Sequence, residues 1–180
     1  VVVLGLFIHM GITYLTILKM FTNMDLKHFF KSMAPVQLLA FSTSSSGATL
    51  PVTMKRCEKD LGVSEEISSF VLPLGATINM DGTALYQGVA AVFIAQAIGM
   101  DLTFADQFTI VATAVLASIG TAAVPGAGII MLVIILEAIN VPSQGIALIL
   151  GVDRILDMIR TATNVTGDAT IACAMDSLEN

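Results

Sequence analysis

The sequence predicts an all-α membrane protein, and three features of its 180 residues indicate that fold class. Charged residues make up 12% of the chain, against about 25% in a typical soluble domain. Apolar runs long enough to cross a bilayer recur along the chain. The third feature is an internal repeat, in which an apolar segment broken by small and turn-forming residues is followed by a longer apolar segment, twice.

The first half begins with a membrane-crossing helix predicted over residues 1–21, in which we expect His9 to be a tolerated, neutral helix residue. Residues 27–60 contain an uncharged stretch from Ser32 to Met54, interrupted by serines, a glycine and a proline. Each arm of this stretch has about ten residues, or about 15 Å of helix, which is half the hydrocarbon thickness. Because basic residues stand at both ends, we predict a re-entrant helical hairpin that enters and leaves on one side.

The second half repeats this order. Residues 66–100 predict a crossing helix that is broken at "INMDGT", where we expect Gly82 to let the helix unwind. Residues 105–139 predict a second re-entrant hairpin with "GTAAVPGAG" at its tip, and residues 143–176 predict a last crossing helix. Interrupted apolar segments in corresponding positions of two halves indicate a transporter with its binding site near the membrane midplane.

Charged residues at the mouths of the two hairpins predict their orientation. Lysines and arginines flank the first hairpin, whereas the loops beside the second hold Asp101, Asp106 and Glu137 and no basic residue. By the positive-inside rule, the first hairpin enters from the cytoplasm and the second from outside. The two tips are therefore predicted to meet around one site, like two gates.

The last crossing segment carries polar residues three or four positions apart, on one face of a helix: Asp157, Arg160, Thr161, Asn164 and Asp168. A charge at mid-bilayer costs about 2.5–3.5 kcal/mol on insertion scales, so this face must meet partners or water. Asp153 and Arg154, one turn earlier, are expected to form a structural pair. An ion pair between Asp157 and Arg160 that only steadies the helix bundle is the structural alternative to a binding site.

The chemistry of this face favours an acidic amino acid as the ligand. The guanidinium of Arg160 suits a carboxylate, and Asp157 suits an ammonium group. Backbone N–H groups of "STSSSG" at the first tip can hold a second carboxylate. Asn79 and Asp81 of "INMDGT", together with the amide and carboxylate of the last helix, form an oxygen-rich set that suits an alkali cation.

Three other functions remain open at this stage. A C4-dicarboxylate carrier would bring no ammonium to meet Asp157, whose carboxylate would repel it. An intramembrane aspartyl protease would use Asp81 and Asp168 as a catalytic dyad, but its "GxGD" signature is missing. An ion channel would leave Arg160 unexplained. The sequence therefore favours a carrier, not an enzyme, and we expect no nucleic-acid partner.

Four motifs in order, "SSSGATLPVTM", "LPLGATINMDGTALYQG", "ASIGTAAVPGAG" and "DMIRTATNVTGDA", resemble the glutamate/aspartate transporter family, also called sodium:dicarboxylate symporters. The resemblance covers nearly the whole chain and matches the C-terminal, transport-domain half of the family. It implies an elevator-type carrier in the cytoplasmic membrane that imports aspartate or glutamate with Na⁺. It also implies a homotrimer held together by N-terminal helices that we expect to precede this segment in a longer protein. A proton-coupled carrier of the same family is an alternative.

The resemblance also implies roles for individual residues. Those implied in substrate binding are Ser44, Ser45, Ser46, Thr83, Val124, Gly128, Asp157, Arg160, Thr161 and Asn164. One sodium ion is implied among Gly75, Asn79, Asn164 and Asp168, and another among the carbonyls of Thr77, Ser118, Ile119 and Thr121. A third is implied at Asn79 and Asp81, with help from an earlier helix.

The sequence departs from the family pattern at four positions. Proton-coupled members have glutamate where this chain has Gln87, which carries no proton to release. Many members have an additional arginine in the place of Ser44 or Met158, so the charge around the gates differs here. Members often have glycine in the place of Ala123, so we expect a stiffer second tip.

Overall fold

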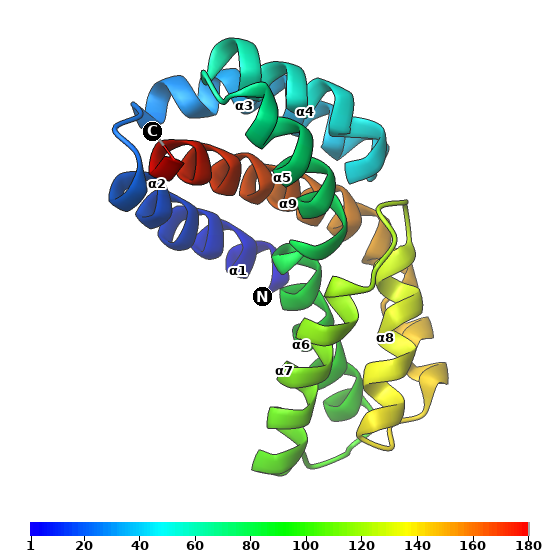
Figure 1. Cartoon of the computed structure of the whole chain (residues 1–180). Helices are drawn as coiled ribbons and strands as arrows, with labels where there is room; N and C mark the ends of the chain where they lie inside the picture. Colours follow the sequence, from blue (N-terminus) through cyan, green and yellow to red (C-terminus); the bar gives the residue numbers. More distant parts are fainter. Residues whose placement is uncertain (180) are drawn as a thin grey trace.

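The computed structural model describes residues 1–179, which are almost entirely helical and contain no strand (Figure 1). In chain order the elements are α1 (Val2–His9), the π-helical turn η1 (Met10–Tyr14), α2 (Leu15–Phe21), α3 (Leu26–Thr43), α4 (Ser46–Asp60), α5 (Glu65–Ile78), α6 (Asp81–Ala97), α7 (Phe104–Ile119), α8 (Ala127–Ala138), the 3₁₀ helix η2 (Ser143–Leu148) and α9 (Leu150–Glu179). The all-helical prediction is therefore confirmed.

The first three elements form one continuous rod, Val2–Phe21. Among the residues described, it is the one helix that matches a membrane crossing in length and hydropathy, while α7 and α8 are apolar but shorter. Large hydrophobic side chains stand exposed on the rod and on α7, for example Leu4, Phe7, Phe108 and Leu116.

Two helical hairpins, α3–α4 and α7–α8, follow the predicted order. Ser44 ends α3 in the left-handed conformation, and Ser45 caps α4 by accepting a hydrogen bond from the Ala48 N–H. The arms are longer than the ten residues that the uncharged stretch predicted, since α3 has 18 residues and α4 has 15. The helices lengthen because they continue through the charged flanks, where Asp25 caps α3 with its carboxylate.

The break in the second long segment falls at Asn79 and Met80, between α5 and α6. The expectation that Gly82 unwinds the helix is wrong, because Gly82 lies within the first turn of α6. Its missing side chain serves a close approach instead. A Cβ atom there would lie 2.7 Å from the Asn164 Oδ1 and 3.1 Å from the Arg160 carbonyl oxygen, both on α9.

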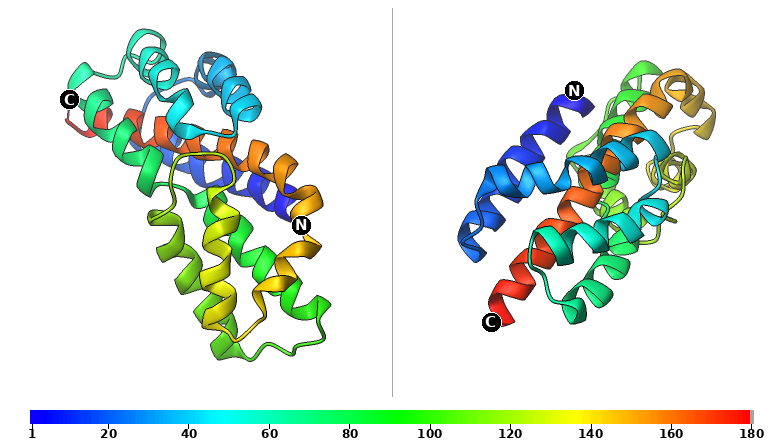
Figure 2. Two further views of the ribbon diagram at one scale, coloured as in Figure 1. Left: turned by 90° about the vertical axis from the view of Figure 1, so that its right-hand side faces the viewer. Right: turned by 90° about the horizontal axis from the view of Figure 1, so that it is seen from above.

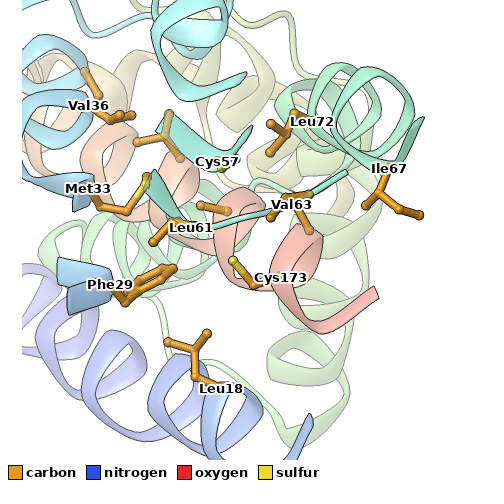
Figure 3. Close-up of a cluster of buried hydrophobic side chains, with 14 residues drawn as sticks. Leu18, Phe29, Met33, Val36, Cys57, Leu61, Val63, Ile67, Leu72 and Cys173 are labelled. Carbon is orange, nitrogen blue, oxygen red and sulfur yellow. The ribbon is translucent and has the colours of Figure 1, made fainter. Parts of the chain in front are cut away.

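Helix α9 is the element around which the others pack. It contacts α3, α4 and α5, the rod, and α6, and the views of Figure 2 show the rod running along one side of it. A first hydrophobic cluster joins α2, α3, α4, α5 and the C-terminal half of α9, with Phe29, Met33 and Leu72 fully buried (Figure 3). A second cluster joins α6, α7 and α8, with Ile94 and Leu132 at its centre. The polar face of α9 lies between these two cores.

Candidate functional site

The tips of the two hairpins touch each other (Figure 2). The Ser45 hydroxyl donates a hydrogen bond of 2.7 Å to the Ala123 carbonyl oxygen. The Gly47 N–H donates to the same oxygen at 3.2 Å. A Cβ atom at Gly47 would lie 3.2 Å from that oxygen, so the glycine permits the close approach.

A small cavity lies beneath the joined tips. Its volume is about 20 Å³, and it is lined by Ser44, Ser46, Met80, Thr83, Thr121, Ala122, Ala123, Val124, Gly128, Asp157, Thr161 and Asn164. A cavity needs about 10–15 Å³ on this measure to hold one water molecule. The cavity therefore has room for about one water molecule, and anything larger can enter only if the tips move apart.

Arg160 lies behind the cavity with a side chain that is 1% exposed. Its Nε and Nη2 donate to the Asp157 Oδ1 at 3.1 and 3.0 Å, and its Nη1 donates to the Asp153 Oδ1 at 3.2 Å. The guanidinium carbon lies 3.9 Å from the centroid of the Tyr86 ring, and the Tyr86 hydroxyl donates to the Asp153 Oδ1 at 2.7 Å. Two carboxylates and an aromatic face thus hold the guanidinium.

The expected pair of Asp153 and Arg154 is wrong. Asp153 is buried against Arg160 and Tyr86, whereas Arg154 is exposed. Residues 153 and 160 are seven positions apart, almost two full helical turns, so they share a face. Neighbouring positions such as 153 and 154 point about 100° apart.

Asp157 and Arg160 are bonded to each other in this conformation, as the structural alternative foresaw. The pair neutralises a buried guanidinium, because an unpaired buried charge is strongly unfavourable. The second Asp157 oxygen, Oδ2, accepts a 2.9 Å hydrogen bond from the Gly126 N–H at the tip of the second hairpin. Asp157 therefore links the arginine to the second tip.

Most of the predicted substrate residues line this cavity, and four of the predicted residues need separate description. Ser45 is used in the contact between the tips. Val124 is 57% exposed, although it also contributes to the cavity wall. Ser44 faces the cavity with a buried hydroxyl that has no hydrogen-bond partner among residues 1–179. A Cβ atom at Gly128 would lie 3.2 Å from the Arg160 Nη2, so the glycine admits the guanidinium.

Three of the four residues predicted for the first cation site come together. The Asn79 side-chain amide donates to the Asp168 Oδ1 at 3.0 Å, and a Cβ atom at Gly75 would lie 2.7 Å from that same oxygen. Asn164 faces α6 instead. Its Oδ1 accepts from the Gly82 N–H at 2.9 Å, and its amide donates to the Thr83 hydroxyl at 3.1 Å.

The second predicted cation set lies at the ends of α5 and α7, two helices that contact each other. Ser118 and Thr121 are buried, whereas Thr77 and Ile119 are exposed. The hydroxyls of Thr77, Ser118 and Thr121 each donate to a carbonyl oxygen of a neighbouring turn, at 2.7–2.9 Å. These hydroxyl protons are thus used within the helices, while the hydroxyl oxygens keep their lone pairs.

Asp81 is held by two residues of the rod. His9 Nε2 lies 2.5 Å from its Oδ2, and the Tyr14 hydroxyl donates to both carboxylate oxygens at 2.8 Å. The expectation that His9 is merely a tolerated helix residue is wrong. No spacing rule for a regular helix pairs positions 9 and 14, which is why sequence reasoning missed this contact.

Comparison with known proteins places this arrangement among transporters. The family model of the sodium:dicarboxylate symporter family matches residues 1–178. Excitatory amino acid transporter 4 of Mus musculus is 44% identical over 177 residues, which is 98% of this chain and 32% of that protein. An excitatory amino acid transporter of Caenorhabditis elegans is 47% identical over 92% of this chain and 33% of its own length. Human excitatory amino acid transporter 2 is 45% identical over 93% of this chain and 29% of its own length. The chain thus spans about a third of the length of these relatives.

Proposed function

Because the chain belongs to the sodium:dicarboxylate symporter family, we propose that it is part of a membrane carrier that imports aspartate or glutamate together with sodium ions. Its relatives are named excitatory amino acid transporters. The observation that carries the proposal for this chain is the buried pair of Arg160 and Asp157 beneath two joined hairpin tips.

An acidic amino acid is the ligand that can replace both partners of this pair. Its ammonium group takes the place of the guanidinium at Asp157, and its side-chain carboxylate takes the place of Asp157 at Arg160. Its second carboxylate can be received by the free Ser44 hydroxyl and by backbone N–H groups at the first tip. The substrate residues named above are proposed in these roles.

The rival functions fit the contacts less well. A C4-dicarboxylate brings no ammonium, so separating Arg160 from Asp157 would leave the Asp157 carboxylate facing another anion. An aspartyl protease needs two carboxylates that share a proton. Asp81 is bonded to His9 and Tyr14, whereas Asp168 is bonded to Asn79, so each carboxylate has its own partners.

We propose that residues 1–180 form part of a mobile transport domain in the cytoplasmic membrane, with α3–α4 and α7–α8 as re-entrant hairpins. The exposed apolar side chains of the rod and of α7 support contact with lipid. The homotrimer and the elevator movement belong to the proposal for the whole protein. Sodium ions at Asp168 and Asp81 would order the site, and an ordered site binds the amino acid more tightly.

Uptake of labelled aspartate by vesicles containing the full-length protein tests this function. We expect saturable uptake when an inward sodium gradient is present, and a loss of accumulation when choline replaces the external sodium. Succinate in tenfold excess is expected to compete poorly with aspartate. Uptake that does not depend on the sodium gradient would contradict the proposed coupling to sodium. Stronger competition by succinate than by glutamate would favour the dicarboxylate carrier.

Gln87 predicts how this carrier responds to pH. Its buried side-chain amide donates a 3.0 Å hydrogen bond to the Gly128 carbonyl oxygen of the second hairpin. In the variant Gln87→Glu, only the protonated acid can donate to that oxygen, and the carboxylate repels it. We expect uptake by this variant to fall about tenfold as the pH rises through the titration of the new acid, because a buried acceptor loses its donor. Uptake by the native protein should change little over the same range, and parallel profiles for the two proteins would contradict the role of this bond.

A further inference from the structure

The turn η1 (Met10–Tyr14) interrupts an otherwise regular rod with π-helical hydrogen bonding. Single π-helical turns inside α-helices are rare and often mark functional sites. In a regular α-helix, two residues five positions apart point about 140° away from each other. The wider π turn brings such residues nearly into line, because its hydrogen bonds join positions five apart. Here His9 and Tyr14 are five positions apart, and both reach the same carboxylate.

Three helices converge on this carboxylate. Asp81 begins α6, and the rod supplies His9 and Tyr14. Helix α9 makes room for the tyrosine, since a Cβ atom at Gly167 would lie 2.6 Å from the Tyr14 hydroxyl oxygen. The Asp81 side chain is nevertheless 30% exposed and that of His9 is 23% exposed, so one side of the carboxylate is open. The tyrosine is buried, and its ring meets the His9 ring edge-on at 5.0 Å.

The two residues that hold Asp81 differ in how they can respond to a cation. Hard cations take oxygen ligands, such as carboxylate oxygens. The Tyr14 hydroxyl donates to both Asp81 oxygens, so it can keep its bond to Oδ1 while an ion contacts Oδ2. The His9 Nε2 lies 2.5 Å from the Oδ2 atom and fills the space in which an ion would contact that atom.

We propose that the rod contains the switch of the Asp81 cation site: sodium binding displaces His9 from Asp81, while Tyr14 stays and positions the carboxylate. This inference rests on the proposed function, because it assigns two residues of this chain to one of its sodium sites. His9 is then a competitor of the ion, and Tyr14 is a positioning residue. Thr13, whose hydroxyl lies 3.2 Å from the His9 Nδ1, can retain the displaced ring on the rod.

The test measures sodium binding directly, as the rise in melting temperature of the purified full-length protein with increasing NaCl, at one pH and without substrate. Choline chloride keeps the ionic strength constant. The variants are His9→Phe, which keeps a ring but removes its nitrogen atoms, and Tyr14→Phe, which removes only the hydroxyl. Ile12→Ala, which alters an exposed side chain on the same π turn, is the matched control.

The expected results have opposite signs for the two residues. His9→Phe should lower the half-saturating sodium concentration by about fivefold to tenfold, because the ion no longer competes with a hydrogen bond to a charged group. Tyr14→Phe should raise it by about tenfold, because the carboxylate loses its fixed donor. Ile12→Ala should match the native protein. The sodium concentration needed for half-maximal aspartate uptake should shift in the same directions.

Two results would overturn the inference. One is a His9→Phe protein that needs as much sodium as the native protein, or more. The other is a Tyr14→Phe protein whose melting temperature falls equally at every sodium concentration, which would be a purely structural effect. A native protein that shows no sodium-dependent stabilisation would instead contradict the sodium coupling in the proposed function. Failure of the His9 switch and failure of the proposed function therefore give different results.

Discussion

Uptake of aspartate is expected to fall at least about 100-fold when Arg160 is replaced by cysteine, because the ligand then loses two charge-assisted hydrogen bonds to a planar guanidinium. The structure adds a second cost. Asp153 and Asp157 both bond to this guanidinium, and removing one partner of a buried ion pair typically costs about 3–5 kcal/mol of stability. The amount of folded protein must therefore be measured beside uptake.

Two further variants separate binding from folding in this experiment. Arg160→Lys keeps the positive charge between the two carboxylates but loses the fork that suits a carboxylate, so the protein should fold and still transport acidic substrates poorly. Arg154→Cys removes an exposed cation six positions earlier on the same helix and should leave uptake unchanged. An Arg160→Cys protein with native affinity for aspartate would refute the role proposed for the arginine.

Replacing Asp157 by asparagine is expected to change which ligand the carrier prefers. The substrate ammonium loses its ionised acceptor, so the affinity for aspartate should fall by about 10-fold to 100-fold. Succinate has no ammonium to lose, and without the Asp157 carboxylate it no longer meets a like charge. Succinate and unlabelled aspartate are each titrated against the uptake of labelled aspartate. The half-inhibiting concentration of succinate, divided by that of unlabelled aspartate, should therefore be well below the native value.

Asparagine can still accept the 2.9 Å hydrogen bond from the Gly126 N–H, so the second tip should remain attached to α9. Asp101→Asn, which removes an exposed carboxylate from a loop, is the control for the change in net charge. If Asp157→Asn keeps the native affinity for the substrate aspartate, the Asp157 carboxylate serves only to neutralise Arg160. The ammonium group of the substrate must then be bound elsewhere.

Much of this fold could be predicted from the sequence, because apolar runs indicate where helices lie and their interruptions indicate where helices break. The serines at 44–46 and the "GTAAVPGAG" segment predicted two hairpin tips, and hairpin tips form at both places. The four ordered motifs predicted the family, and the match over residues 1–178 confirms it. Asp157, Thr161 and Asn164 line the cavity, because spacings of three and four keep side chains on one face of a helix.

The predictions for His9, Gly82 and Asp153 were wrong for physical reasons that the periodic spacing of residues does not reveal. The contact of His9 with Asp81 depends on a π-helical turn, which changes the angular register of the rod. The sequence pattern predicts Gly82 as a helix breaker, yet Gly82 lies inside α6, where the close approach of α9 leaves no room for a side chain. The spacing of seven residues between Asp153 and Arg160 is a signal in the sequence that they share a helix face. Pairing Asp153 with its neighbour Arg154 was the simpler prediction, and it overlooked this spacing.

The contact between the hairpin tips has a consequence for how the cavity beneath them opens. A single oxygen atom, the carbonyl of Ala123, receives both bonds that the first tip sends to the second. Whichever hairpin lifts first, the same two bonds break, and the oxygen is then free to be hydrated from the side that has opened. The hydrogen bonding between the two tips is thus concentrated at one main-chain atom, which no side-chain substitution at position 123 can delete.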